Sequence, residues 1–276
     1  MCSEIDPCQV APASGRCESR TGPKPVPPFL PISFWVLLVV ACAACTPVAR
    51  RQPQLLATSL QEIAPHGDGD HFVYVWKQVL QRGAVRAGIH VEHVTALDHG
   101  EFDVTLSEDG AVIGHTRFRD DGHALLLLSE TLGRSLRLSY DPPLPQIDTP
   151  LFAGESRTTA TVTVNALEDD KQLETLEVTQ VIQTGATAPV HSSLGDYPHG
   201  IKVHTVRTLQ FAEGPVELTS TMVLVPGIGE IHSEGTATGA PPLSRELACA
   251  TIAGRHVGNC QTLRQRVEEL ERIGTP

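Results

Sequence analysis

The chain has 276 residues, of which 41% are hydrophobic and 19% are charged, enough for one large domain or two small ones. Its 21 Lys and Arg against 32 Asp and Glu give a formal net charge of −11, which suits phosphate neutralisation poorly. These values exclude a disordered chain and a minimal disulfide-stapled scaffold, and they argue against nucleic acid as a partner.

The N-terminal region has the pattern of an export signal. Residues 29–41 form an uncharged apolar run that follows three basic residues and precedes small residues and cysteines. The first 28 residues are long and rich in Pro and Cys for a signal peptide, which indicates a start codon placed too early. We predict an extension over 1–28 and a signal peptide over 29–45.

The end of the apolar run resembles the lipobox of bacterial lipoproteins. It reads Val39-Val40-Ala41-Cys42, followed by Ala-Ala-Cys45, and the resemblance implies that Cys42 or Cys45 carries diacylglycerol. The aliphatic Val39 favours Cys42, whereas the even pair of cysteines downstream favours Cys45. The alternative is an uncleaved membrane anchor over 29–49, since about 20 apolar residues span a bilayer. The resemblance places the protein at a membrane, most simply the outer membrane, facing the periplasm or the cell surface.

Residues 46–70 are expected to form a tether that contains a short helix. Apolar residues at 55, 56, 60 and 63 have the spacing of one or two helical turns. The tether ends in His66-Gly67-Asp68-Gly69-Asp70-His71, so His66, Asp68, Asp70 and His71 are weak candidates for metal ligands. The alternative is a solvated loop, and we expect no bound metal or other cofactor.

The β-rich domain is predicted to begin at residue 71. Gly and Asp-Gly signals recur every ten to twelve residues, as in a meander of hairpins. The runs between them predict strands over 72–78, 91–97, 102–107, 111–119, 124–130 and 134–140.

A proline-rich crossing follows over 141–154, because Pro lacks the N–H that a sheet ladder needs. A second series of strands is predicted over 157–167, 173–183, 201–211, 216–225 and 231–236. Polar and apolar residues alternate in these strands, which indicates an antiparallel sheet with one dry face. The expected fold is mainly β, a curved sheet of about 10 or 11 strands as a half-barrel or open barrel.

The C-terminus changes to a helical period. Leu263, Val267 and Leu270 lie on one face of an amphipathic helix predicted over 260–273, with Asn259 as its N-cap. Cys249 and Cys260 are expected to form a disulfide in an oxidising compartment, which would tie this helix to the preceding strand. The alternative is a nucleophilic pair of Cys249 with His256, for which no orienting third group is evident.

Four consecutive leucines, Leu125, Leu126, Leu127 and Leu128, make both faces of one predicted strand apolar. Such a strand must be covered on both sides. One face can meet the core and the other the C-terminal helix; the alternative is that one face lines a groove for a hydrophobic ligand.

Two turn motifs resemble those of uncharacterised exported bacterial lipoproteins with a β-rich domain. They are the Pro-Pro crossing that begins at Asp141 and the Pro-Gly-x-Gly-x-Ile hairpin over 226–231. The nearest architecture by analogy is the half-barrel of the lipoprotein carriers LolA and LolB, and that similarity implies a cavity for an acyl chain.

Common hydrolase signatures are absent from the sequence, including Gly-x-Ser-x-Gly, His-Glu-x-x-His and Ser-x-x-Lys. No catalytic residue is therefore expected. The sequence favours an exported, lipid-anchored protein without a catalytic role that binds a hydrophobic ligand or lipid. The alternatives are a structural module that binds an envelope protein and a metal-dependent hydrolase.

Overall fold

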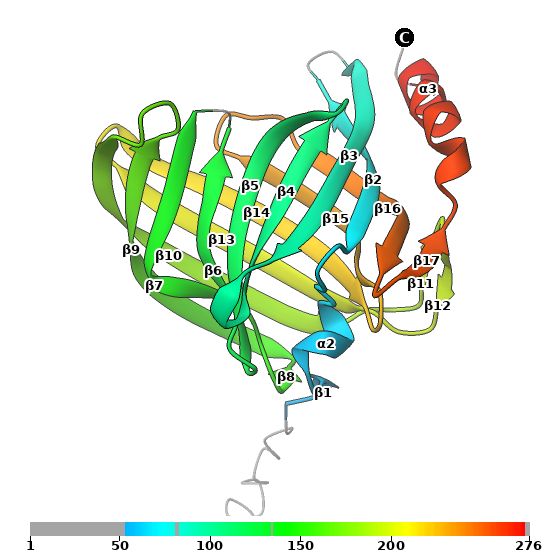
Figure 1. Ribbon diagram of the computed structural model, residues 1–276, viewed down its shortest axis with the longest axis horizontal. Helices are drawn as coiled ribbons and strands as arrows, with labels where there is room; N and C mark the ends of the chain where they lie inside the picture. Colours follow the sequence, from blue (N-terminus) through cyan, green and yellow to red (C-terminus); the bar gives the residue numbers. More distant parts are fainter. Residues whose placement is uncertain (1–52, 81–82, 134, 274–276) are drawn as a thin grey trace, which may run out of the picture. The chain divides into compact units, whose positions relative to one another are not determined.

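A closed antiparallel barrel of twelve strands forms the domain in the computed structural model, which describes residues 53–80, 83–133 and 135–273. Strand β15 pairs with β16 as well as with β14, and this pairing closes the ring (Figure 1). In order around the barrel the strands are β15 (Gly229–Ala237), β14 (Gly214–Val225), β13 (Ile201–Phe211), β10 (Gln172–Ala186), β9 (Gly154–Ala166), β7 (Leu136–Asp148), β6 (Ala124–Leu132), β5 (Ala111–Asp120), β4 (Glu101–Glu108), β3 (Val85–Ala96), β2 (His71–Val79) and β16 (Leu243–Ile252).

The expectation of a half-barrel or open barrel, made by analogy with LolA and LolB, is wrong. The mainly β, antiparallel character is confirmed, and each predicted run falls mainly on one strand of the ring. The missing strand is β16, which bridges β2 and β15 and thereby joins the two edges of the predicted sheet. A sheet without free edges exposes no unpaired row of backbone groups. Strand β17 (Arg255–Gly258) adds to β16 outside the ring.

The proline-rich segment is a strand and not a crossing. Strand β7 continues through Pro142, Pro143 and Pro145 to Asp148, where it pairs with β6. It pairs with β9 only as far as Asp141, so beyond that residue the prolines face no ladder partner on the β9 side. A proline is tolerated on a strand edge that needs no N–H donor.

The part of the predicted tether that the structure describes belongs to the barrel core. Residues 55–57 form β1 (Leu55–Ala57), which pairs with β8 (Leu151–Phe152), and the predicted helix is the single turn α2 (Leu60–Ile63). The side chain of Ile63 is fully buried. Residues 60–66, which we call the plug segment, lie at one end of the barrel (Figure 1).

The hairpin predicted over 226–231 holds this plug segment. Gly227 and Gly229 both have positive φ, at 78° and 92°. The Gly227 amide donates to the carbonyl of Glu62 at 2.6 Å, and a Cβ on Gly229 would lie 3.3 Å from Pro65. The glycines therefore serve the close approach of the plug as well as the turn.

The C-terminal helix is confirmed as α3 (Leu263–Ile273), preceded by a 3₁₀ turn, η3 (Cys260–Thr262), whose N-cap Asn259 accepts from the Gln261 amide at 2.9 Å. It lies outside the barrel against β2 and β3 (Figure 1). Cys249 and Cys260 are joined in a disulfide with 5.5 Å between their Cα atoms. Cys249 is thus not a free thiol, and His256 instead contacts the Thr251 hydroxyl at 2.9 Å.

The interior of the barrel holds two clusters of buried apolar side chains. One gathers the plug segment, β1 and the strands around β2, β14 and β15; the other gathers β6, β7, β9 and β10. All of these strand pairs and both clusters lie within residues 53–273, and residues 52–276 form one compact unit. We therefore expect this part of the chain to fold by itself.

Candidate functional site: a charged cavity inside the barrel

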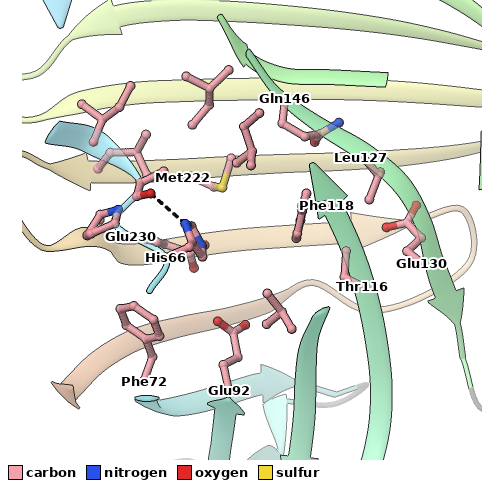
Figure 2. Close-up of a pocket in the computed structure, with 18 of the residues that line it drawn as sticks. His66, Phe72, Glu92, Thr116, Phe118, Leu127, Glu130, Gln146, Met222 and Glu230 are labelled. Atoms are coloured by element: carbon pink, nitrogen blue, oxygen red, sulfur yellow. Dashed lines mark hydrogen bonds between the residues drawn. The ribbon is translucent and has the colours of Figure 1, made fainter. Parts of the chain in front are cut away.

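A cavity of about 250 Å³ remains between the apolar clusters. Its wall comes from the plug segment and from the strands of the ring other than β9 and β10; part of it is seen in Figure 2. Apolar side chains such as Phe72, Phe118 and Leu224 make part of the wall. Seven ionisable side chains also line it, namely His66, Tyr74, Glu92, Glu130, Arg207, Glu230 and Arg245.

The first charged group in the wall centres on Arg245 of β16. Its Nε donates to Glu230 at 2.8 Å and to the Ser233 hydroxyl at 3.0 Å, its Nη2 donates to Glu230 at 3.0 Å, and its Nη1 donates to Glu92. The guanidinium lies 4.3 Å from the ring centre of Tyr74, which is a cation–π contact. We call these five residues the Arg245 cluster.

Arg245 keeps its partner Glu230 in the charged form. Burial disfavours the charged form of Glu230, but the attraction and hydrogen bonds of Arg245 outweigh burial and lower the pKa of Glu230. The pKa of Tyr74 is raised well above its usual value by burial and by the nearby carboxylates, so this phenol stays neutral. One guanidinium therefore faces two carboxylates.

The second charged group centres on Arg207 of β13, whose side chain is 8% exposed. Its Nη1 donates to Glu130 and to the Tyr140 hydroxyl, and its Nε donates to the side-chain oxygen Oε1 of Gln180 at 3.2 Å. Its Nη2 lies 3.5 Å from the Gln146 side-chain oxygen, and the Tyr140 hydroxyl donates to Glu130 at 2.5 Å. In this Arg207 cluster one guanidinium meets one carboxylate.

His66 lies in the cavity wall as a neutral imidazole. Its Nδ1 lies 2.8 Å from the carbonyl of Ala64 (dashed in Figure 2), and because a carbonyl only accepts, Nδ1 must carry the proton. Burial lowers the pKa of His66. Its ring stacks on Phe102 with 4.9 Å between centres. The second nitrogen, Nε2, is therefore a hydrogen-bond acceptor.

The other proposed metal ligands do not gather around His66. Asp70 is buried and accepts from the amides of Gly67 and Ala253, both at 2.7 Å, while Asp68 accepts from the Ala96 amide at 3.0 Å. His71 lies in the β2 ladder opposite His93. Among the residues that the structure describes, no three His, Cys, Asp or Glu side chains are placed to share a metal ion.

The leucine run is divided between the two faces of β6. Leu125 and Leu127 are buried and line the cavity, whereas Leu126 and Leu128 are half-buried on the alternate face. The alternation of a strand thus places two of the four candidate residues at the cavity. Cys42 and Cys45 lie outside the described residues.

The barrel wall opens beside the cavity, between β7 and β9. Residues 144–148 of β7 pair with β6 but not with β9, and a hollow of about 280 Å³ lies there. Gln146 and Ile147 line both this hollow and the cavity. Gln180 of β10 spans the opening, since its Nε2 donates to the Pro145 carbonyl at 2.6 Å.

The sequence did not indicate the charged residues of the cavity, apart from His66. One signal was present for Arg207, because Val203, Arg207 and Leu209 all occupy the dry face of the alternating strand. A charged residue in phase with buried aliphatic ones must be paired inside the protein.

No protein-family model matches the chain, and no curated protein sequence matches it. Two solved structures are similar in part. A protein from Bacteroides fragilis predicted to be exported, with a YmcC-like fold, is 13% identical with a TM-score of 0.41, over 71% of this chain and 98% of that one. A predicted lipoprotein from Parabacteroides distasonis is 12% identical with a TM-score of 0.37, over 66% and 95%. No helix among the described residues is long and apolar enough to span a bilayer.

Proposed function

We propose that this protein is an exported lipoprotein, anchored through an acylated Cys42 or Cys45, whose barrel holds a small amphipathic molecule. The observation that carries the proposal is the cavity of about 250 Å³, which combines apolar and ionisable side chains in one wall. Binding sites for small molecules share this composition, with a few polar groups set in an apolar surface. No residue of the cavity is assigned a catalytic role.

A purely structural barrel would have little use for this interior. Each buried ion pair costs desolvation energy that the attraction between the charges barely repays, and apolar side chains of the same size would stabilise the fold as well or better. Residues of the Arg245 cluster and of the Arg207 cluster line the same cavity. Polar groups kept at such cost support a role in recognition.

The size of the cavity limits its ligand. Sites for drug-sized molecules measure roughly 300–1,000 Å³, so about 250 Å³ suits a small molecule or one group of a larger one. The hollow beside β7 supplies a route from the surface, closed by the side chains of Gln146 and Gln180.

Native mass spectrometry of residues 46–276, secreted to a bacterial periplasm without the lipobox, tests the binding proposal. We expect an adduct that is released on gentle activation. Thr116→Phe fills the cavity and should remove the adduct, whereas Thr175→Phe, the same change on the exposed face of β10, should retain it. An apo mass for the unaltered protein, or an adduct that Thr116→Phe leaves unchanged, would contradict the proposal.

The anchor is tested separately with the full chain. Cells grown with labelled palmitate should incorporate label into the unaltered protein. Cys42→Ser and Cys45→Ser are a matched pair, and one of the two should abolish incorporation while the other retains it. Equal labelling of both single variants and of the double variant would exclude lipidation at either cysteine.

A further inference from the structure

The charges that line the cavity do not balance. Glu92, Glu130 and Glu230 supply three carboxylates, Arg207 and Arg245 supply two guanidinium groups, and His66 is neutral. With all five charged groups ionised, the wall carries one net negative charge. In a partly buried site, where charges are screened less than at the surface, such an excess favours a ligand that brings a positive charge.

Every guanidinium nitrogen of the two arginines already makes at least one contact with an oxygen of the protein. Each of the three guanidinium nitrogens of Arg245 donates to Glu92, Glu230 or Ser233. Each of the three of Arg207 is directed at an oxygen of Gln180, Glu130, Tyr140 or Gln146. An anionic ligand would compete with these partners for the guanidinium groups and would add to the negative charge of the three carboxylates.

Acceptors, in contrast, are available toward the cavity. Figure 2 shows the side chains of Glu92 and Glu130 at two separate places in the cavity wall, on β3 and β6. A carboxylate offers about four acceptor sites, and both contacts of Glu130 with Tyr140 and Arg207 fall on its Oε1. His66 adds Nε2 as a further acceptor, since its proton is on Nδ1.

Resting on the function proposed above, we infer that the ligand of the cavity is a small cationic amphiphile, a primary ammonium group carried on a short apolar body. The ammonium has three donors and no acceptor, which complements a wall whose open positions are carboxylate oxygens and the Nε2 of His66. The apolar body packs against Phe118, Leu125 and Leu127, which line the same space. A fatty acid, the ligand suggested by analogy with acyl carriers, has the opposite charge.

Three probes of equal chain length test the inference, namely hexylammonium, hexanol and hexanoate, titrated calorimetrically into residues 46–276 at pH 7. We expect hexylammonium to bind about tenfold or more tightly than hexanol, because hydrogen bonds to charged groups are the stronger kind. Hexanoate should bind most weakly. Glu92→Gln should cost hexylammonium about tenfold in affinity while leaving hexanol nearly unchanged.

The controls separate this inference from the function on which it rests. Glu177→Gln, on the exposed face of β10, removes the same charge outside the barrel and should change none of the three affinities. Glu130→Gln provides a second variant if Glu92→Gln fails to fold. Hexanoate binding as tightly as hexylammonium would overturn the inference and leave a binding cavity standing. Failure of all three probes, together with an apo mass, would overturn both.

Discussion

The two buried arginines of the barrel stand in similar settings with different charge. Each lies against a tyrosine ring, Arg245 at 4.3 Å from the centre of Tyr74 and Arg207 at 5.5 Å from that of Tyr140. Arg245 pairs with two carboxylates, whereas Arg207 pairs with Glu130 and two glutamine side chains. The Arg207 cluster is therefore neutral, and the Arg245 cluster carries the excess negative charge of the cavity.

The difference also separates two structural tasks. The Arg245 cluster joins β16 to β15 and β3, on either side of the closing strand. The Arg207 cluster joins β13 to β6, β7 and β10, beside the opening in the wall. The Arg245 cluster thus connects the strands where the ring closes. The Arg207 cluster connects the strands beside the opening between β7 and β9.

Removing either arginine should lower the free energy of unfolding more than any other change proposed for the barrel. Arg207→Met leaves one buried carboxylate without its partner and should cost about 3–5 kcal/mol in the free energy of unfolding. Arg245→Met leaves two such carboxylates and should cost more. Urea denaturation of both variants measures the two losses.

Neutralising the carboxylates in the same variants tests how many ionised carboxylates each arginine pairs with. Arg207→Met with Glu130→Gln should recover most of the loss, because no buried charge then remains at that cluster. Arg245→Met should need both Glu92→Gln and Glu230→Gln for the same recovery. Full recovery of Arg245→Met by either single change would contradict the assignment of two ionised carboxylates to that cluster.

The next effect is a pH dependence of stability that arises at His90, beside Arg245. His90 stacks on Trp76 at 5.3 Å, and burial together with Arg245 lowers its pKa from 6.5 to about 4. Between pH 4 and pH 6.5, His90 is protonated in the unfolded chain and neutral in the folded protein. Stability should therefore fall as the pH is lowered from 6.5 to 4, by at most about 3 kcal/mol.

His90→Phe keeps the stacked ring and removes the titration. The variant should lose less stability than the unaltered protein over this pH range, in urea denaturation at pH 7, 5.5 and 4.5. His66 also has a lowered pKa and remains in both proteins, so only the difference between the two curves reports on His90. Parallel curves would show that His90 is not the group responsible.

The sequence predicted most strands of the sheet but not the closing of the barrel, because the closing strand β16 has no visible alternation. The alternation of apolar and polar residues identified β13 and β10, since Val203 and Val178 each belong to a row of alternate buried residues. In β16 the residues Leu247, Ala248, Cys249 and Ala250 are all buried, so no alternation marks that strand. An apolar run of this length is ambiguous between strand and helix, and without β16 the predicted sheet stayed open.

The sequence of β3 did not reveal the site, because the polar residues of this strand face the barrel interior and its apolar residues face outward. Helix α3 covers the outer face of this strand, so Ala87 and Ile89 face outward beneath the helix. His90 and Glu92 face the interior instead, where a dry face would be expected. Tertiary cover decides which face is buried, and the strand's own sequence cannot show it.

The weakest effect on stability is expected at Gln180, beside the opening between β7 and β9 and next to the Arg207 cluster. Gln180 donates to the Pro145 carbonyl at 2.6 Å and accepts from Arg207 at 3.2 Å, with only 1% of its side chain exposed. Gln180→Leu keeps the volume and removes both bonds. We expect a loss of about 1–3 kcal/mol, because the Pro145 carbonyl and the Arg207 Nε lose their buried partner.

Gln183→Leu is the matched control for this opening. Gln183 lies on the exposed face of the same strand and donates to Glu155 at 2.8 Å, so its loss should cost within about 0.5 kcal/mol. Native-state hydrogen exchange gives the second measurement. Amides over 144–148 should exchange faster in Gln180→Leu, while those over 136–141, which pair with β9, should keep their rates. A uniform increase along β7 would mean that Gln180 stabilises the whole barrel and does not close a local opening.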